Sequence, residues 1–315
     1  MNRPIAGYRP VWGLLPHLGL IRFAGVDSLS FLQGQLSNDT RRLGAGEPLL
    51  AAFSTPQGRV ISVLRLLPHS GGVLAVVPRE MAGMTLERLR KYVMRSKVQI
   101  EDWSERFAVI GLDDHDRVGG SEVALPAVGQ GYVEQNGIGV ARADAVGDRY
   151  WAVGDIQHLA HYLGDAPAAP FGQAWRLADI RAGWPQIYAP TSELFVAQML
   201  NLDLIDGISF TKGCFTGQEI IARTQHLGRI KRRLYRLGLP PGSWAIGQPI
   251  RLADGRSGRL TEVVTGDAGV EALAVLNREP GAAGPGAGPD AADGAAPLAM
   301  IAAALLPLPY PLDPA

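Results

Sequence analysis

Short apolar runs bounded by glycine, proline or polar residues alternate with amphipathic segments along the first part of the chain. A short run that is apolar throughout predicts a buried strand, whereas apolar residues spaced three or four apart predict a helix. The segments predicted as strands are 19–23, 49–53, 59–67, 72–77, 107–112 and 150–153, and the predicted helices begin near Ser28 and cover about 79–97, 156–163 and 171–182. The order strand, strand, helix, strand between 50 and 112 is typical of a small α+β unit inserted between other segments.

The pattern changes after about Gly238, where glycine and proline become frequent and helical spacing disappears. Short strands are predicted at 249–252, 258–264 and 271–276. Such strands are typical of a small β-barrel or β-sandwich. Residues 280–297 consist almost entirely of Gly, Ala, Pro and Asp, and this composition predicts a flexible loop because it cannot bury a core. An apolar strand is predicted at 298–306, so we expect the loop to be an insertion within a last domain.

Composition narrows the functional class. The 315 residues support two or three domains. Thirty basic residues balance thirty acidic ones, so no global field favours nucleic acid or an anionic membrane. The N-terminus lacks the apolar run of a signal peptide, and the most apolar stretch, 298–306, is shorter than the roughly 20 residues that span a bilayer. The single cysteine, Cys214, excludes an intramolecular disulfide and an all-cysteine zinc site. We expect a monomeric cytoplasmic protein without a membrane segment.

The segment from Lys212 to Glu219 carries the most specific chemistry. Thr216 and Glu219 have the spacing of a capping box, which makes Thr216 the expected N-cap of a helix that continues through 220–222. Cys214 would then lie just before a helix N-terminus and two residues after Lys212. The partial positive charge of the helix N-terminus and the Lys212 ammonium both favour the thiolate form of Cys214. The alternative is a lone buried cysteine in a turn. No His–Asp pair is evident nearby, so a protease or acyl-transfer nucleophile is not expected.

Three further features stay open on the residues alone. A basic strip within 223–236 could meet RNA, a polyglutamate tail or an acidic partner, although a solvated basic segment is the commoner outcome. Its members are Arg223, His226, Arg229, Lys231, Arg232, Arg233 and Arg236. His158 and His161 share a helical face without further ligands nearby, so no metal site is expected. Trp175 fits a core position and a pocket for a flat ring equally well.

Several blocks of the sequence resemble a known family. Residues 210–219 are similar to the K-G-C-[YF]-x-G-Q-E signature of the YgfZ family, whose members are relatives of the glycine-cleavage T-protein, GcvT. Other blocks agree in order: 31–39 is similar to F-[LM]-Q-G-Q-[LV]-[TS]-x-D, 58–60 to the family's turn before a strand, 198–202 to P-Q-x-x-N-L with Ala197 at the usual proline, and 308–310 to the C-terminal ending. The resemblance covers nearly the whole chain.

The resemblance implies an α+β protein with a three-domain GcvT-like architecture round a central hole. A GcvT-like folate-binding domain would comprise residues 1–48 and 113–237, and a ferredoxin-like α+β insertion would comprise 49–112. Residues 238–315 would form a C-terminal β-barrel that contains the flexible loop at 280–297. The pattern of apolar positions points independently to the insertion and to the barrel.

The resemblance also implies a function. The family binds tetrahydrofolate or a derivative and supports assembly or repair of iron–sulfur clusters, and through client enzymes of the tRNA methylthiotransferase type it affects tRNA modification. Lys212 and Cys214 match residues held essential in the family, with the thiol expected near the bound folate, and Trp175 matches a folate-contacting tryptophan. The other residues expected to bind the cofactor are Gln218, Glu219, Arg223 and Asn201. Leu18 stands where a second folate-linked tryptophan is usual, and Arg181 where many relatives carry a folate-binding glutamate.

One departure from the T-protein bears on the reaction. The T-protein carries a pair of aspartates needed to act on the aminomethyl group, and Ser62 and Val63 occupy those positions here. Neither side chain is a carboxylate, so we expect no aminomethyltransferase activity and no conventional enzyme. Two alternatives stay open: a folate-dependent one-carbon transferase, and a non-catalytic folate-sensing adaptor whose basic strip docks RNA or a partner.

Overall fold

The computed structural model describes residues 11–113, 124–126, 131–143, 149–163, 171–226, 230–279 and 300–312. The predicted loop at 280–297 lies outside these residues, and so does Arg229. The chain divides into two compact units, and the three-domain division that the resemblance implies stays a prediction. Unit 1 comprises residues 1–51 and 64–175, and unit 2 comprises 52–63 and 176–315. None of the helices in the described ranges has the length and apolar character needed to cross a membrane.

One sheet of unit 1 consists of five antiparallel strands. Its order is β1 (Val11–Leu14), β7 (Phe107–Asp113), β10 (Arg149–Asp155), β9 (Ile138–Arg142) and β8 (Tyr132–Gln135). The central strand β10 is buried along nearly its whole length, as expected for a strand that is covered on both faces. The helix α4 (Ile156–Leu163) follows β10 directly and packs on it.

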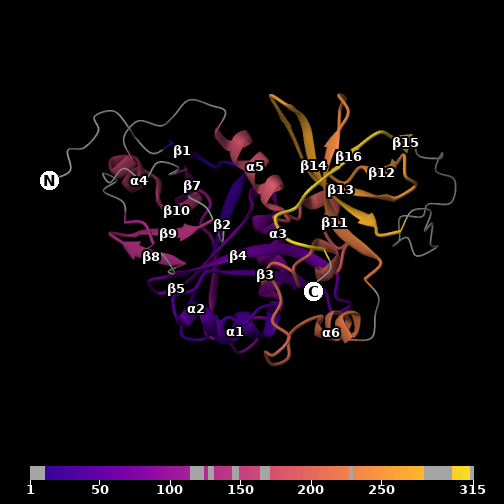
Figure 1. Cartoon of the computed structure of the whole chain (residues 1–315). Coiled ribbons are helices and arrows are strands. Elements are labelled where there is room, and N and C mark those ends of the chain that lie inside the picture. The colour runs from indigo at the N-terminus through magenta and orange to yellow at the C-terminus, as the bar shows by residue number, and fades with distance from the viewer. Residues whose placement is uncertain are drawn as a thin grey trace. The chain divides into compact units, whose positions relative to one another are not determined.

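A second sheet, drawn in indigo to violet in Figure 1, contains strands from the first third of the chain. Its order is β3 (Leu49–Ser54), β4 (Val60–His69), β5 (Gly72–Pro78), β2 (Leu18–Ala24) and β6 (Gln99–Asp102). β3 and β4 each run from one unit into the other, because the division falls after Ala51 and after Val63. The helices of this region are α1 (Ser28–Gln35), α2 (Arg41–Gly44) and α3 (Arg79–Arg90).

The strand pairing links the range 49–112, predicted as an insertion, to strands on either side of it. β2 precedes that range but is hydrogen-bonded between β5 and β6, while β7, at the end of the range, joins the other sheet. β2 is almost entirely buried, so its backbone needs a partner strand on each side. α3 ends at Arg90 rather than near Lys97, because Leu89 is its last buried residue and the chain turns there toward β6.

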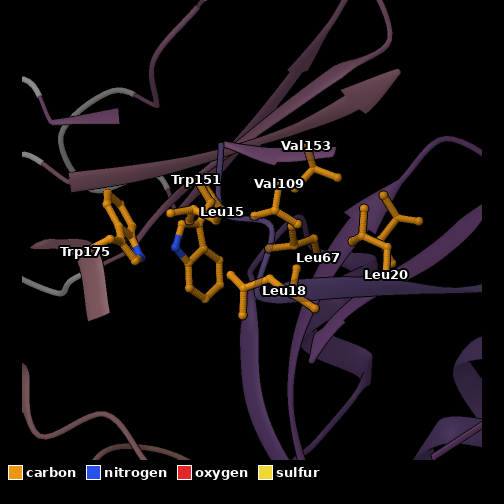
Figure 2. Packing of buried hydrophobic residues seen from close by; sticks show 12 residues of the cluster. Leu15, Leu18, Leu20, Leu67, Val109, Trp151, Val153 and Trp175 are labelled. Carbon is orange, nitrogen blue, oxygen red and sulfur yellow. The ribbon is translucent and has the colours of Figure 1, made fainter. Parts of the chain in front are cut away.

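One core cluster of unit 1 contains two buried tryptophans. Leu18, Trp151 and Trp175 belong to one buried cluster and are each at most 5% exposed. Figure 2 shows Trp151 and Trp175 at one end of this cluster and Leu20 at the other. Gly111 makes room for Trp175, since a Cβ on that glycine would lie 2.5 Å from the Cε3 atom of the indole. Trp175 therefore packs in the core of unit 1, and its contact with a ligand stays a prediction.

The sheet of unit 2 has six strands, coloured orange to yellow in Figure 1. Its order is β15 (Met300–Ile301), β12 (Pro249–Leu252), β13 (Ser257–Gly266), β14 (Gly269–Asn277), β11 (Arg232–Leu239) and β16 (Ala304–Leu306). The predicted domain boundary at 238 therefore cuts through β11. Between β10 and β11 the chain forms α5 (Phe171–Ala182), the short helices η1 (Ala189–Thr191) and η2 (Ala197–Leu200), and α6 (Gln218–His226).

The connection between β15 and β16 shows that this sheet is strongly curved. The two strands occupy opposite edges of the sheet, yet only Ala302 and Ala303 separate them in the chain. The edges of a flat six-stranded sheet lie roughly 24 Å apart, whereas three residue steps reach at most about 11 Å. The sheet must therefore curl until its edges approach each other, as expected for a barrel.

Candidate functional site

The site begins with a tight turn between β3 and β4. The Gly58 N–H donates to the Thr55 carbonyl at 2.9 Å, and the Thr55 N–H donates to the Arg59 carbonyl at 2.8 Å. Gly58 has a φ of 72°, a left-handed conformation that glycine adopts without strain. The Arg59 guanidinium donates to the Leu194 carbonyl at 2.9 Å, so the end of the turn is fixed within unit 2.

A second turn follows Cys214 directly. The Gln218 N–H donates to the Phe215 carbonyl at 3.2 Å, and the Phe215 N–H donates to the Gln218 side-chain oxygen at 3.0 Å. These reciprocal hydrogen bonds close the turn at both ends. Gly217 lies inside it with a φ of 83°, which again favours glycine. Gln218, a predicted cofactor ligand, therefore uses its side-chain oxygen to hold the turn.

The two turns lie against each other, backbone to backbone. A Cβ on Gly217 would lie 2.6 Å from the Thr55 carbonyl oxygen and 3.1 Å from the Gly58 Cα. A Cβ on Gly58 would lie 2.7 Å from the Ile220 Cβ. Real Cβ atoms do not approach so closely, so both positions require glycine on steric grounds as well as for their φ angles. The structure thus joins two sequence motifs, at 58–60 and at 212–219, that lie far apart in the chain.

Cys214 lies on the exposed side of this assembly. Its side chain is exposed, so the alternative of a buried structural cysteine is wrong. A Cβ on the preceding Gly213 would meet no atom within 4 Å, which leaves open space beside the thiol. The Lys212 ammonium lies over the Phe215 ring, 4.8 Å from its centroid, in a cation–π arrangement. Lys212 and Cys214 therefore lie on a segment that hydrogen bonds close on one side of the thiol, at the turn 215–218. On the other side, the segment has open space at Gly213.

The start of α6 differs from the prediction. The helix begins at Gln218, so Gly217, and not Thr216, occupies the position before the first helical residue. The reason is the left-handed Gly217, whose conformation ends the turn and cannot continue a helix backwards. Cys214 is therefore separated from the helix by the whole turn. Glu219 and Arg223 are exposed and four residues apart on α6, so they share one helical face.

Asn201, another predicted ligand, has its side chain engaged with the backbone. It is fully buried in a left-handed conformation, its amide donates to the Leu234 carbonyl at 2.9 Å, and its oxygen accepts the Leu234 N–H at 3.2 Å. Gln198, three residues earlier, donates to the Ile221 carbonyl at 2.7 Å. The block at 198–202 therefore braces β11 and α6, and we leave Asn201 out of the proposed ligand set.

The predicted basic strip is not one surface. Arg233 is only 2% exposed and forms a double ion pair with Asp203, at 2.6 and 2.9 Å. Arg236 pairs with Glu271 at 2.7 Å. The strip was expected to be continuous because its charges are close in sequence. Since side chains on a strand alternate between faces, β11 directs successive arginines to opposite sides.

The remaining members of the strip are dispersed. The Arg232 guanidinium donates to the Asn277 side-chain oxygen at 3.0 Å, and burial together with the charges of Arg59 and Arg259 lowers the pKa of Arg232. Arg223 and Lys231 are exposed, and Arg229 lies outside the described residues. A direct RNA contact through 223–236 is therefore poorly supported.

Arg181 is also engaged within unit 2. It donates to the Glu271 carboxylate from Nε at 3.0 Å and from Nη2 at 2.7 Å. Burial raises the pKa of Glu271, but hydrogen bonds from Arg181 and Arg236 outweigh burial and lower it. Arg181 therefore stabilises a carboxylate of the barrel.

Unit 1 contains buried indole N–H groups with no hydrogen-bond partner. Nε1 of Trp151 and Nε1 of Trp175 are both buried, and neither finds an acceptor among the described residues. Arg65 lies 4.3 Å from the Trp151 ring centroid and Arg149 lies 4.7 Å from that of Trp175. An unsatisfied buried donor costs about 1–3 kcal/mol, so this cluster favours an added hydrogen-bond acceptor. Leu18, at the position of the family's second tryptophan, packs in the same cluster.

A buried polar network in unit 2 was not predicted from the sequence. Glu262 is 4% exposed and accepts hydrogen bonds from Arg176 and from the Tyr188 hydroxyl. Burial raises the pKa of the Glu262 carboxyl, because the Arg176 guanidinium offsets only part of the desolvation cost. The partners lie more than 70 residues apart in the chain and fall in no motif, so no local signal indicates them.

The two positions that replace the aspartates of the T-protein lie within β4. Ser62 is fully buried and Val63 is 1% exposed. Neither can act as a carboxylate base, and neither is accessible from solvent.

Comparison with known proteins gives the family. The chain is 32% identical over 248 residues to the tRNA-modifying protein YgfZ of Hamiltonella defensa. The aligned region covers 76% of this chain and 71% of that protein. The chain is 30% identical over 275 residues to the tRNA-modifying protein YgfZ of Yersinia pestis strain Pestoides F, which covers 82% of each chain. The chain belongs to the YgfZ family. The segment 212–219, which the glycine-bearing turns hold in place, is therefore the YgfZ signature. A search against family models found no match to the chain.

A solved structure supports the fold. The glycine cleavage system aminomethyltransferase T of Bartonella henselae superposes with a TM-score of 0.59 over 85% of this chain and 79% of that protein, at 17% identity. The GcvT-like fold predicted from the sequence is thus confirmed for this YgfZ family member. At this identity the likeness concerns the fold alone.

Proposed function

We propose that this chain binds tetrahydrofolate or a derivative and supports the assembly or repair of iron–sulfur clusters in enzymes that modify tRNA. The observation that carries the proposal is the exposed Cys214 directly before a turn that packs through Gly217 against Gly58. The curated relatives are named tRNA-modifying proteins, which supports the link to tRNA.

The buried indole N–H groups of unit 1 suit a folate. A pterin ring is planar and carries several nitrogen and oxygen acceptors, so it can accept hydrogen bonds from donors such as Nε1 of Trp151 and Trp175. Arg65 and Arg149 hold the two indole rings by cation–π contacts. When bound, the folate supplies a carrier for one-carbon groups. Glu219 and Arg223, which belong to unit 2, stay sequence-based predictions.

The role proposed for Cys214 follows from its exposure and from its being the only cysteine. Thiolates are the usual ligands of iron–sulfur clusters, and such clusters take four protein ligands. One cysteine cannot supply that set, so storage of a cluster on this chain by cysteines alone is excluded. An accessible thiol can instead bind or react at one atom of a client protein's damaged cluster. The missing carboxylate at Ser62 and Val63 disfavours the alternative of aminomethyl transfer.

Replacing Cys214 with serine is expected to abolish the function while the fold persists. The measurement is the fraction of methylthiolated nucleosides in tRNA, determined by mass spectrometry in cells whose own copy of the gene is deleted. We expect the Cys214→Ser protein to restore no more methylthiolation than an empty vector. Its thermal unfolding should match that of the wild type, because the side chain is exposed.

The matched control is Thr211→Ala, an exposed polar position three residues before the thiol. This variant should restore methylthiolation as the wild type does. Full restoration by Cys214→Ser would contradict the proposal.

A further inference from the structure

The last turn of α3 and the loop after it, in unit 1, are rich in basic residues, and the proposed function assigns them no role. We define the basic loop as residues 88–97, which contain five basic side chains and no acidic one. These are Arg88, Arg90, Lys91, Arg95 and Lys97. Because the chain as a whole has no net charge, this concentration is a local feature.

Hydrogen bonds close the basic loop into a compact surface. The Arg90 guanidinium donates to the Ile100 carbonyl at 3.1 Å, which joins the start of the loop to the strand that follows it. Inside the loop, the Tyr92 N–H donates to the Leu89 carbonyl at 3.0 Å. The Lys97 backbone N–H donates to the Asp27 carboxylate at 2.7 Å and fixes the far end. The charges are therefore held within one small region instead of along an extended segment.

The positive charge of the basic loop is largely uncompensated. Lys91, Arg95 and Lys97 are exposed, and none of them forms an ion pair with any residue in the described ranges. Two carboxylates lie beside the loop: Glu87 pairs with Arg90 at 2.9 Å, and Asp27 accepts the backbone N–H already mentioned. Three exposed cationic heads therefore remain without an acidic partner among the described residues.

Two apolar side chains are exposed at the same place. Met94 is 90% exposed, and Val26, next to the Asp27 that anchors the loop, is 86% exposed. On a membrane these two side chains would insert about seven heavy atoms, which is roughly half the length of a myristoyl chain. Since one whole myristoyl chain gives only marginal membrane binding, the two side chains are too small to anchor the protein to a membrane. Phosphate contacts from three cations provide a larger and more specific contribution.

We propose that the basic loop binds the sugar–phosphate backbone of RNA, with tRNA as the molecule that binds. Lys and Arg heads donate to phosphate oxygens, and the exposed Met94 and half-buried Tyr92 lie where riboses or unstacked bases can pack on them. The choice of tRNA over other polyanions rests on the proposed function. The surface proposed to bind RNA is therefore the basic loop of unit 1 and not residues 223–236 of unit 2.

The test is the affinity of the full chain for an unmodified tRNA transcript, measured by fluorescence anisotropy from about 50 to about 300 mM KCl. The variant Arg95→Ala/Lys97→Ala is expected to bind at least about tenfold more weakly at ~100 mM KCl. The slope of log K against log [KCl] should also shrink by about 2, because two phosphate contacts are lost. Thermal unfolding should not change, since both side chains are exposed and outside any ion pair.

The matched control is Lys231→Ala/Arg251→Ala, which removes two exposed basic side chains from unit 2. It should leave the affinity and the slope within about twofold of the wild type. Equal loss in both variants, absence of tRNA binding at low salt, or binding to phosphatidylserine vesicles in place of tRNA would each overturn the proposal. The Cys214→Ser experiment measures methylthiolation and not RNA binding, so the two proposals fail independently.

Discussion

Replacing Asp203 with asparagine is expected to lower the free energy of unfolding by about 3–5 kcal/mol. Asp203 is the only carboxylate that the described residues place in an ion pair with Arg233, at 2.6 Å, and both side chains are nearly inaccessible to solvent. Removing its charge leaves a buried guanidinium without compensation. Urea unfolding followed by circular dichroism measures the change.

The matched control removes both charges together. In Arg233→Met/Asp203→Leu no buried charge is left unpaired, so most of the lost stability should return. If Asp203→Asn unfolds at the same urea concentration as the wild type, the pair does not have the buried geometry described here.

Replacing Gly217 with alanine is expected to destabilise the chain by about 2–5 kcal/mol. A left-handed alanine costs about 1–2 kcal/mol, and the overlap with Thr55 and Gly58 adds about 1–3 kcal/mol. The overlap can be relieved only by separating the two turns, so the segment before Gly217 should shift as well. The free energy of unfolding is measured by urea titration, and the shift by the rate at which Cys214 reacts with a thiol reagent.

The matched control for this position is Gly213→Ala. No atom lies within 4 Å of a Cβ at Gly213, and its φ is outside the left-handed range, so stability should change by less than about 0.5 kcal/mol. Equal destabilisation by both substitutions would mean that the two turns are not in contact.

The sequence predicted most central elements because burial on both faces leaves a continuous apolar run. The strands at 49–53 and 72–77 and the helices at 156–163 and 171–182 were located within a residue or two. The edge strands β1, β6 and β8 were missed, because one side of such a strand lacks a neighbour and the strand needs few apolar residues, whereas the edge strand β3 is buried throughout and was predicted. β6, with the sequence Gln-Ile-Glu-Asp and one buried residue, shows this clearly. The partner of β2 could not be predicted, since pairing depends on the whole sheet.

The candidate site was predicted in part. The signature at 212–219 identified the exposed Cys214 and its glycines, because a motif of this kind is read locally. The contact between Gly58 and Gly217 could not be predicted, since it joins segments more than 150 residues apart. Arg233 was assigned to the basic strip but is buried in an ion pair with Asp203, and the Asn201 side chain binds the backbone of Leu234. A polar side chain in a motif gives no sign of whether it binds a ligand or a buried backbone group.

The most direct test of the central claim is a titration of reduced folates against the full chain, followed by intrinsic tryptophan fluorescence. We expect saturable binding to the wild type and at least about tenfold weaker binding to Trp175→Phe, which lacks the buried N–H donor. Trp244→Phe is the control, because that indole N–H already donates to the Pro240 carbonyl at 3.0 Å, and it should bind as the wild type does. No saturable binding of any reduced folate, or unchanged affinity in a folded Trp175→Phe, would contradict the account.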